Sequence, residues 1–183
     1  MNFYELGIKE ARRIEMTPLA DDRGWFARAY CQREFVDAGI KATFVQMNHS
    51  QCVKRGTLRG LHYQIPPHAE GKLIRCVRGS IFDVVLDIRA NSTTFGSWVG
   101  VELSESNQTM VYCPAGCAHG YQALTDGAEV IYQATTNYAP DHERQVRFDD
   151  PAFGIQWPIP IPILSPKDAA TPNVPTDFQG VTF

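Results

Sequence analysis

The sequence has no excess of basic residues. It contains 17 Lys and Arg residues against 20 Asp and Glu residues, which gives a formal net charge of −3 at pH 7. A protein that binds nucleic acid through its phosphates needs positive charge to neutralise them. The composition therefore argues against non-specific binding of DNA or RNA.

Long apolar segments are missing as well. No run approaches the roughly 18 residues that a membrane-spanning helix needs, and residues 2–13 carry charges where a secretory signal would be apolar. The chain is nevertheless 44% hydrophobic and has 10 Phe, 7 Tyr and 3 Trp, enough for a substantial core. We therefore expect one cytoplasmic domain, spanning residues 1–183, that does not contact a membrane.

The cysteines do not follow a disulfide or zinc pattern. There are five of them, an odd number, and none forms a C-x-x-C pair. Cys113, Cys117 and His119 are close in sequence, but their spacing is not that of a structural zinc site. We expect buried apolar cysteines and no metal site here.

Turn residues recur about every ten positions, which is typical of an all-β sandwich or barrel. Three pairs of strand-like segments are separated by short polar or glycine-containing turns, and we expect each pair to form a hairpin. The pairs are Lys72–Val77 with Ile81–Ile88, Trp98–Leu103 with Thr109–Tyr112, and Gly120–Leu124 with Glu129–Thr135. Three successive hairpins predict a meander that closes into a barrel.

Helix signals are few and the C-terminal segment is rich in proline. The clearest helix candidate is Gln32–Gly39, whose final glycine suits a C-terminal cap. Six prolines follow from position 158 onward, so this segment cannot extend a central strand. We expect it to wrap the surface and to bring residues 165–168 to the mouth of the barrel.

His62 is a candidate general base. It lies in the strand-like segment Gly56–Gln64, with Arg59 three residues before it and Lys72 on the next predicted strand. Nearby cations favour a neutral imidazole near pH 7, which is the form that accepts a proton. The ordinary alternative is a hydrogen-bonded histidine of the core.

A second histidine, His119, lies in a P-x-G-x-x-H segment that resembles the second motif of the cupin barrels. Metal-binding cupins carry H-x-H in their first motif, whereas this chain has His62-Tyr63-Gln64 there. Glu70 remains as a possible ligand, but the set is incomplete. A metal-free cupin fits these residues better than an iron or manganese oxygenase.

A series of short segments, in order from about residue 20 to 170, resembles the dTDP-4-dehydrorhamnose 3,5-epimerase family. They include Asp22–Phe26, Gln46–Ser50, Arg59–Gln64, Pro114–Gly120 and Leu164–Asp168. The resemblance implies an all-β, cupin-type jelly-roll barrel with short helices, forming a homodimer without a cofactor. It also implies an isomerase of deoxysugar biosynthesis that converts dTDP-4-dehydro-6-deoxy-D-glucose to dTDP-4-dehydro-L-rhamnose.

The chemistry of such a reaction agrees with the residue types. A ketone at C4 acidifies the hydrogens on C3 and C5, so a base, an acid on the opposite face and a cation near the enolate suffice. His62 suits the base. The resemblance implies that Asp168 pairs with His62, that Lys72 stabilises the O4 oxyanion and that Tyr132 returns the proton. The ordinary alternative for Tyr132 is a core aromatic residue.

The resemblance also implies a set of substrate contacts. The sugar or nucleotide is expected to touch Arg23, Gln46, Asn48, Arg59, His119, Glu143 and Lys167, and Tyr138 is expected to stack on the base. Many family members carry a glutamate where this chain has Arg28. We expect this reversed charge to touch the ligand and to affect the choice of nucleotide or sugar.

Three alternatives stay open at this point. One is an epimerase that inverts C3 only, another is an enzyme that uses a different nucleotide, and the third is a sugar-nucleotide-binding cupin without activity. The dimer is expected from the resemblance, and we expect residues 11–18 to leave an edge strand that could pair across two subunits.

Overall fold

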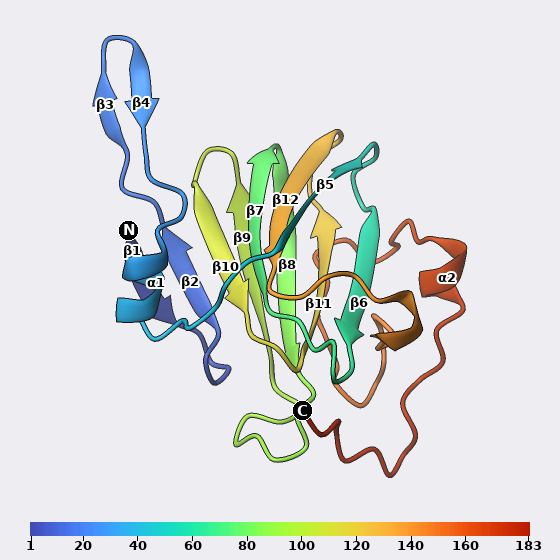
Figure 1. The fold of residues 1–183 in the computed structure, drawn as a ribbon. Helices are drawn as coiled ribbons and strands as arrows, with labels where there is room; N and C mark the ends of the chain where they lie inside the picture. The colour runs from blue at the N-terminus through green and yellow to red at the C-terminus, as the bar shows by residue number, and fades with distance from the viewer.

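Two antiparallel sheets pack face to face and form the body of the protein (Figure 1). The computed structural model describes residues 1–183. The six-stranded sheet has the spatial order β1 (Asn2–Glu5), β2 (Arg12–Glu15), β10 (Thr109–Cys113), β7 (Lys72–Arg78), β12 (Ala128–Ala134) and β5 (Gln46–Cys52). The five-stranded sheet has the order β13 (Glu143–Gln145), β6 (Leu58–Gln64), β11 (Cys117–Ala123), β8 (Ser80–Asp87) and β9 (Trp98–Ser104). This arrangement confirms the predicted all-β jelly-roll class.

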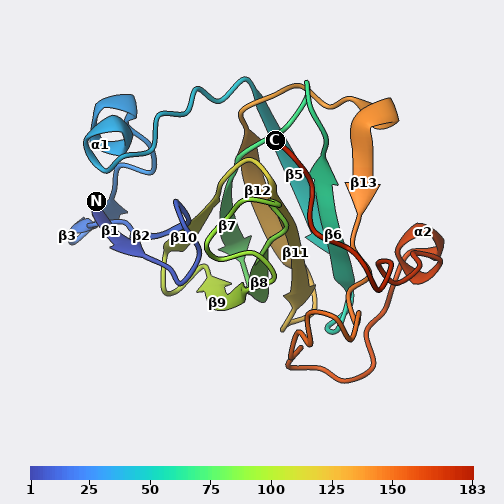
Figure 2. The same ribbon diagram turned by 90° about the horizontal axis from the view of Figure 1, so that it is seen from below.

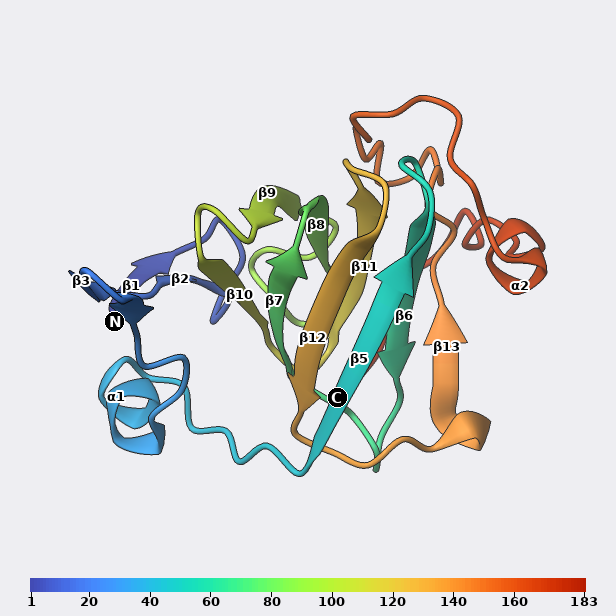
Figure 3. The same cartoon turned by 90° about the horizontal axis from the view of Figure 1, so that it is seen from above.

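The six strands of the three predicted hairpins are present, but all three predicted pairings are wrong. β7 pairs with β10 and β12, whereas β8 pairs with β11 and β9. The same crossing between sheets separates β9 from β10 and β11 from β12. Figure 3 shows the two rows of strands beside each other, β12 and β5 in one and β11 and β6 in the other. Each short turn therefore connects the two sheets, and the fold is a jelly roll instead of a meander.

The physical reason lies in the core between the sheets. Ile74 and Cys76 of β7 and Ile81 and Val85 of β8 are all fully buried in the same apolar cluster. Consecutive strands bury more apolar surface when they face each other across this core than when they lie side by side in one sheet.

The proline-rich segment covers the outer face of the five-stranded sheet, as predicted. Phe153, Trp157 and Phe178 pack against the outward side chains of β6, β8 and β11. Val181 exchanges backbone hydrogen bonds with Ile88 and Ala90 at 2.7 and 3.0 Å. Seen from below, the chain after β13 runs along the outside of this sheet (Figure 2).

The predicted helix is confirmed as α1 (Gln32–Asp37), which lies at the opposite end of the molecule from α2 (Pro166–Ala169) (Figures 1 and 2). Gly39 follows with φ +84°, and the N–H of Ile40 donates to Phe35 O at 2.8 Å. These are the features of a glycine-terminated helix. Phe35 is fully buried and anchors α1 through edge contacts with neighbouring aromatic rings.

A two-stranded hairpin projects from the body near the N-terminus (Figure 1). It consists of β3 (Leu19–Asp21) and β4 (Gly24–Phe26), and Leu19 and Phe26 are each 72% exposed. The expectation that residues 11–18 leave an edge strand is wrong, because β2 is paired on both sides and β1 forms the edge. No helix is both long and apolar enough to cross a bilayer.

Candidate active site

A cavity of about 470 Å³ opens between the two sheets. Residues from strands of both sheets and from the segment before α2 line it. The residues that line it are Ser50, Thr57, Leu58, Arg59, His62, Lys72, His119, Tyr121, Tyr132, Ile163, Leu164, Ser165 and Asp168. All four residues predicted to be catalytic are among them, as are Arg59 and His119 of the predicted substrate contacts.

His62 and Asp168 form a hydrogen-bonded pair although 106 positions separate them. The distance from His62 Nε2 to Asp168 Oδ1 is 2.7 Å. Ser165 caps α2 by accepting the Asp168 N–H at 3.0 Å, and Pro166 occupies the first turn. The local sequence therefore fixes the start of α2 and, with it, the backbone position of Asp168. Burial alone would raise the pKa of Asp168, but hydrogen bonds from His62 and around Ser165 hold it below its usual range. An ionised carboxylate here fixes the imidazole tautomer and stabilises an imidazolium.

Two glycines let the strands that carry both histidines approach closely. Gly60 of β6 has φ +117°, and a Cβ at this position would lie 2.6 Å from the Cα of Gly120. Only glycine fits such a contact. It places His62 of β6 opposite His119 of β11, with both side chains at the cavity.

His119 is held by a buried carboxylate. Its Nε2 lies 2.7 Å from Asp83 Oδ1, while Asp83 Oδ2 has no hydrogen-bond partner. The sequence analysis included Asp83 only within the strand-like segment Ile81–Ile88 and gave it no role in the site. Its signal was the even spacing from the buried residues Val85 and Asp87 on one strand.

Lys72 is also paired with an acidic residue. Its Nζ lies 2.9 Å from Glu70 Oε1 and 3.5 Å from the carbonyl oxygen of His62. Both charged side chains are nearly buried, with 9% and 11% exposed. An ammonium group has three donors, so one remains for a substrate oxygen in the cavity. The sequence analysis considered Glu70 only as a leftover metal ligand, and the structure shows it as the partner of Lys72.

Tyr132 lies on β12 of the six-stranded sheet. Burial raises the pKa of its hydroxyl, an effect that the charge of Lys72 partly offsets. The phenol therefore stays protonated at neutral pH and can donate a proton. Asn48, one of the predicted substrate contacts, is its register partner on β5.

Five of the remaining predicted contacts form a connected set of polar side chains. Gln46 accepts the N–H of Tyr138 at 3.0 Å, the Tyr138 hydroxyl donates to Glu143 at 3.2 Å, and Glu143 pairs with Lys167. Gln46 also donates to Asn48 at 3.3 Å. We call Gln46, Tyr138, Glu143 and Lys167 the polar rim; Lys167 immediately precedes Asp168 of the cavity.

Tyr138 lies beyond the strand that carries Tyr132, because the regular strand β12 ends at Ala134. The hydrogen bond from its backbone to Gln46 places it instead. Tyr138 is 55% exposed, which leaves a flat aromatic face open to stacking.

Two predicted contacts lie away from the cavity. Arg23 is on the projecting hairpin, its side chain is 89% exposed, and it pairs with Asp21. Arg28 pairs with Glu34 of α1 at 2.7 Å. Neither side chain lines the cavity of its own chain, because the hairpin leads this part of the chain outward.

Sequence analysis missed several cavity residues. Ser50 donates to or accepts from the Tyr121 hydroxyl at 2.8 Å, and its even spacing from Asn48 on β5 was the available signal. Ile163 joins the cavity through a parallel bridge to Thr57, a contact that no local pattern indicates.

Comparison with known proteins gives a family match over nearly the whole chain. The model of the family dTDP-4-dehydrorhamnose 3,5-epimerase matches residues 5–175. The enzyme of that name from Salmonella typhimurium is 47% identical over 174 residues, which cover 94% of each chain.

Solved structures are similar as well. The Bacillus anthracis dTDP-4-dehydrorhamnose 3,5-epimerase, with TDP and PPi bound, has a TM-score of 0.92 and 37% identity over 94% of this chain and 99% of that one. The epimerase from Legionella pneumophila, in complex with dTDP-4-keto-L-rhamnose, has a TM-score of 0.88 and 40% identity over 93% and 90%. ChmJ, a 3'-monoepimerase from Streptomyces bikiniensis, has a TM-score of 0.85 and 36% identity over 92% and 85%.

Proposed function

The chain belongs to the dTDP-4-dehydrorhamnose 3,5-epimerase family, and we propose that it is an isomerase that inverts C3 and C5 of dTDP-4-dehydro-6-deoxy-D-glucose. One observation carries this proposal beyond the family match. The paired base His62 belongs to the five-stranded sheet and the protonated Tyr132 to the six-stranded sheet, and both line one cavity. A sugar ring between the sheets meets a base on one face and an acid on the other, as inversion requires.

The reaction begins with proton removal next to the ketone. Neutral His62 takes the proton from C3 or C5, and the electron pair moves toward O4 to form an enolate. Asp168, 2.7 Å from His62 Nε2, stabilises the imidazolium that results. No change of oxidation state occurs, so the step needs no redox partner.

Lys72 and Tyr132 complete the inversion. The ammonium of Lys72 stabilises the enolate oxygen, a contribution of about 3 kcal/mol for one well-placed donor in a water-poor site. Tyr132 then gives its proton to the carbon from the opposite face. Exchange with water reprotonates Tyr132 and deprotonates His62, and the same two groups act again at the second carbon.

The polar rim and Arg59 are proposed to bind the nucleotide. The exposed ring of Tyr138 offers a stacking face for thymine, and the guanidinium of Arg59 suits the diphosphate. The relatives from Bacillus anthracis and Legionella pneumophila bind TDP and a dTDP-sugar, which supports a dTDP-linked substrate. The ion pair with Glu34 neutralises the charge of Arg28, so this charge does not disfavour a dTDP-linked substrate.

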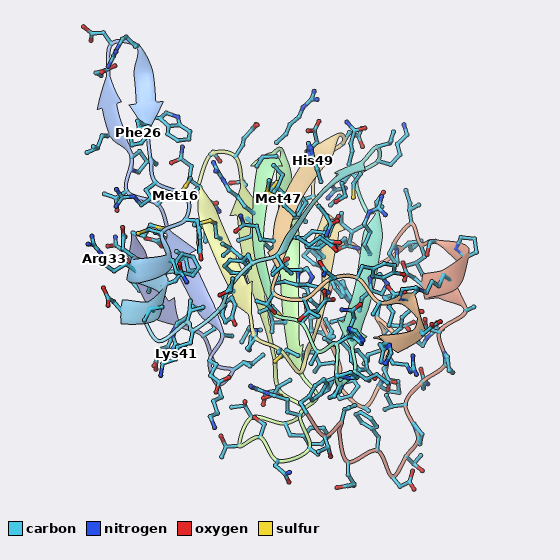
Figure 4. All side chains as sticks on the ribbon, in the orientation of Figure 1. Met16, Phe26, Arg33, Lys41, Met47 and His49 are labelled. Atoms are coloured by element: carbon cyan, nitrogen blue, oxygen red, sulfur yellow. The ribbon has the colours of Figure 1, made fainter.

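We propose further that the protein acts as a homodimer in which the hairpin β3–β4 of one protomer lies against the other. Leu19 and Phe26 of the hairpin are exposed, and so is Met47 on the outer face of the six-stranded sheet, at 64% (Figure 4). Such apolar exposure is typical of a contact surface. In this arrangement Arg23 reaches the nucleotide of the neighbouring site, which accounts for its distance from its own cavity.

Proton exchange with solvent tests the proposed reaction. Incubation with the dTDP-linked 4-keto-6-deoxyglucose in D₂O is expected to place deuterium at C3 and C5, measured by NMR of the sugar. His62→Ala is expected to abolish labelling while dTDP binding, measured by calorimetry, persists.

Two other outcomes identify the alternatives. Labelling at C3 alone would make the protein a 3-epimerase like ChmJ, to which it is 36% identical. Binding of dTDP without any labelling would instead identify a sugar-nucleotide-binding cupin that lacks activity.

A further inference from the structure

The short edge strand β13 lies directly beside the proposed base. It pairs with β6, and Gln145 of β13 is the register partner of His62. Glu143 and Gln145 are two positions apart, so their side chains point to the same side of the strand. That side faces the segment 165–171, which carries Asp168.

Contacts from β13 and from Arg147, two positions after this strand, hold the segment at several points. Glu143 pairs with Lys167, and Gln145 Nε2 donates to Asp168 Oδ1 at 2.8 Å. Arg147 donates to the carbonyl oxygens of Ala169 and Thr171 at 3.2 and 3.0 Å. The position of Asp168 is thus set from β13 as well as from His62.

The orientation of the Gln145 amide follows from its two partners. The carboxylate of Asp168 is an acceptor, so the NH₂ group of Gln145 faces it. The amide oxygen accepts from the hydroxyl of Thr171 at 3.0 Å. Both polar ends of the amide are therefore satisfied in one orientation only.

One carboxylate oxygen of Asp168 accepts hydrogen bonds from both His62 and Gln145. Asp168 Oδ1 lies 2.7 Å from His62 Nε2 and 2.8 Å from Gln145 Nε2. Two donors on one oxygen restrict rotation of the carboxylate, and Asp168 is only 5% exposed, so water does not replace them. The imidazole is thereby aligned through Asp168 from the neighbouring strand.

We propose that Gln145 is a positioning residue that, oriented by Thr171, holds Asp168 in the geometry that pairs with His62. This proposal rests on the proposed epimerase function, because its test measures catalysis. Gln145 touches no reacting atom and acts through Asp168. The alternative is that Gln145 only fastens the C-terminal segment to the sheet, which would affect stability and leave catalysis unchanged.

The variant Gln145→Leu tests this inference. We expect kcat for C3 and C5 exchange to fall about tenfold, with KM and dTDP affinity unchanged, because one hydrogen bond to a charged group is lost. Loss of a donor leaves more negative charge on the Asp168 carboxylate, which favours the imidazolium form of His62, so the acidic limb of the rate profile moves to higher pH. The other charged or titratable groups that act on Asp168 or its partner, namely His62, Arg59, Lys167 and Glu143, stay in place.

A matched control uses a glutamine with the same kind of bond elsewhere. Gln51 on β5 donates to Glu129 at 3.3 Å and is exposed, so Gln51→Leu is expected to leave both kcat and the pH profile unchanged. If Gln145→Leu fails to fold, Thr171→Val replaces it. That variant keeps the shape, frees the amide to rotate, and is expected to cause a smaller loss with the same shift of the acidic limb.

The outcomes separate the two proposals. Wild-type protein without exchange would contradict the proposed function itself. Active wild type together with a variant that keeps the wild-type kcat and pH profile would overturn only the role of Gln145.

Discussion

Lys72 shows how much a single buried charge depends on its surroundings. Its side chain is 9% exposed, and Glu70 Oε1 lies 2.9 Å from its Nζ. A cation buried to this extent needs a partner, because burial without one costs several kcal/mol. Glu70 therefore offsets the cost of burying the ammonium and directs it, while the carbonyl of His62 holds a second donor.

The variant Glu70→Gln keeps the shape of the side chain and removes its charge. We expect the exchange rate to fall at least about tenfold, because Lys72 then stabilises the enolate less well. Affinity for dTDP, measured by calorimetry, is expected to stay the same. Glu5→Gln is the control, since Glu5 is 86% exposed and 3.6 Å from Arg12. An exchange rate equal to that of the wild type would show that Glu70 does not support Lys72.

At the residue scale, motif resemblance named the groups that we propose to act in the reaction, but not the residues that hold them in place. His62, Lys72 and Tyr132 could be named because base, cation and acid each require a particular residue type. The contact of Gln145 with Asp168 could not, because 23 positions separate the two residues and only the packing of α2 against β13 joins them.

At the scale of elements, local sequence determines where strands lie but not what they pair with. β7 and β8 were both recognised from their Val and Ile content. Their separation into two sheets follows from burial of Ile74 and Ile81 in one core, which no short segment records. Turn residues between two strands therefore do not establish a hairpin.

At the end of β8, one buried carboxylate holds the following loop in place. Asp87 is fully buried and accepts hydrogen bonds from Arg89, Ser92 and Thr94, which fasten the loop after β8. Burial alone would raise the pKa of Asp87, but these hydrogen bonds lower it from 3.8 to about 2. The ionised side chain is thus a stabilising feature of the folded chain.

The stability that Asp87 provides depends on pH. Because its pKa is lowered on folding, the contribution is present above about pH 4 and is lost as the pH falls toward 2. The shift corresponds to about 2 kcal/mol. We expect Asp87→Asn to lower the free energy of unfolding at pH 7 by at least this amount, and the difference to shrink toward pH 2.

Urea unfolding at several pH values measures this effect. Asp177→Asn, at an exposed position, serves as the control. A difference between Asp87→Asn and the wild type that stays constant from pH 7 to pH 2 would contradict the assignment.

At the scale of the whole molecule, the proposed position of the hairpin predicts that each protomer contributes a residue to the site of the other. If Arg23 serves the neighbouring site, a protomer with Arg23→Ala and one with His62→Ala are each inactive as homodimers. A mixed dimer contains one intact site, with His62 from one chain and Arg23 from the other.

Mixing the two variants therefore tests the dimer. After subunit exchange, we expect about a quarter of the wild-type exchange activity to return, since half of the dimers are mixed and each has one working site. Sedimentation or light scattering measures the mass. Full activity of Arg23→Ala alone, or no recovery on mixing, would contradict the shared site.

The distance along the chain between His62 and Asp168 also has a consequence for biosynthesis. A ribosome releases every strand of both sheets before the residues of α2. His62, the proposed base, is then already in the nascent polypeptide, but Asp168 is still to be translated. Catalytic competence therefore arises late in translation, after most of the polypeptide has had time to fold.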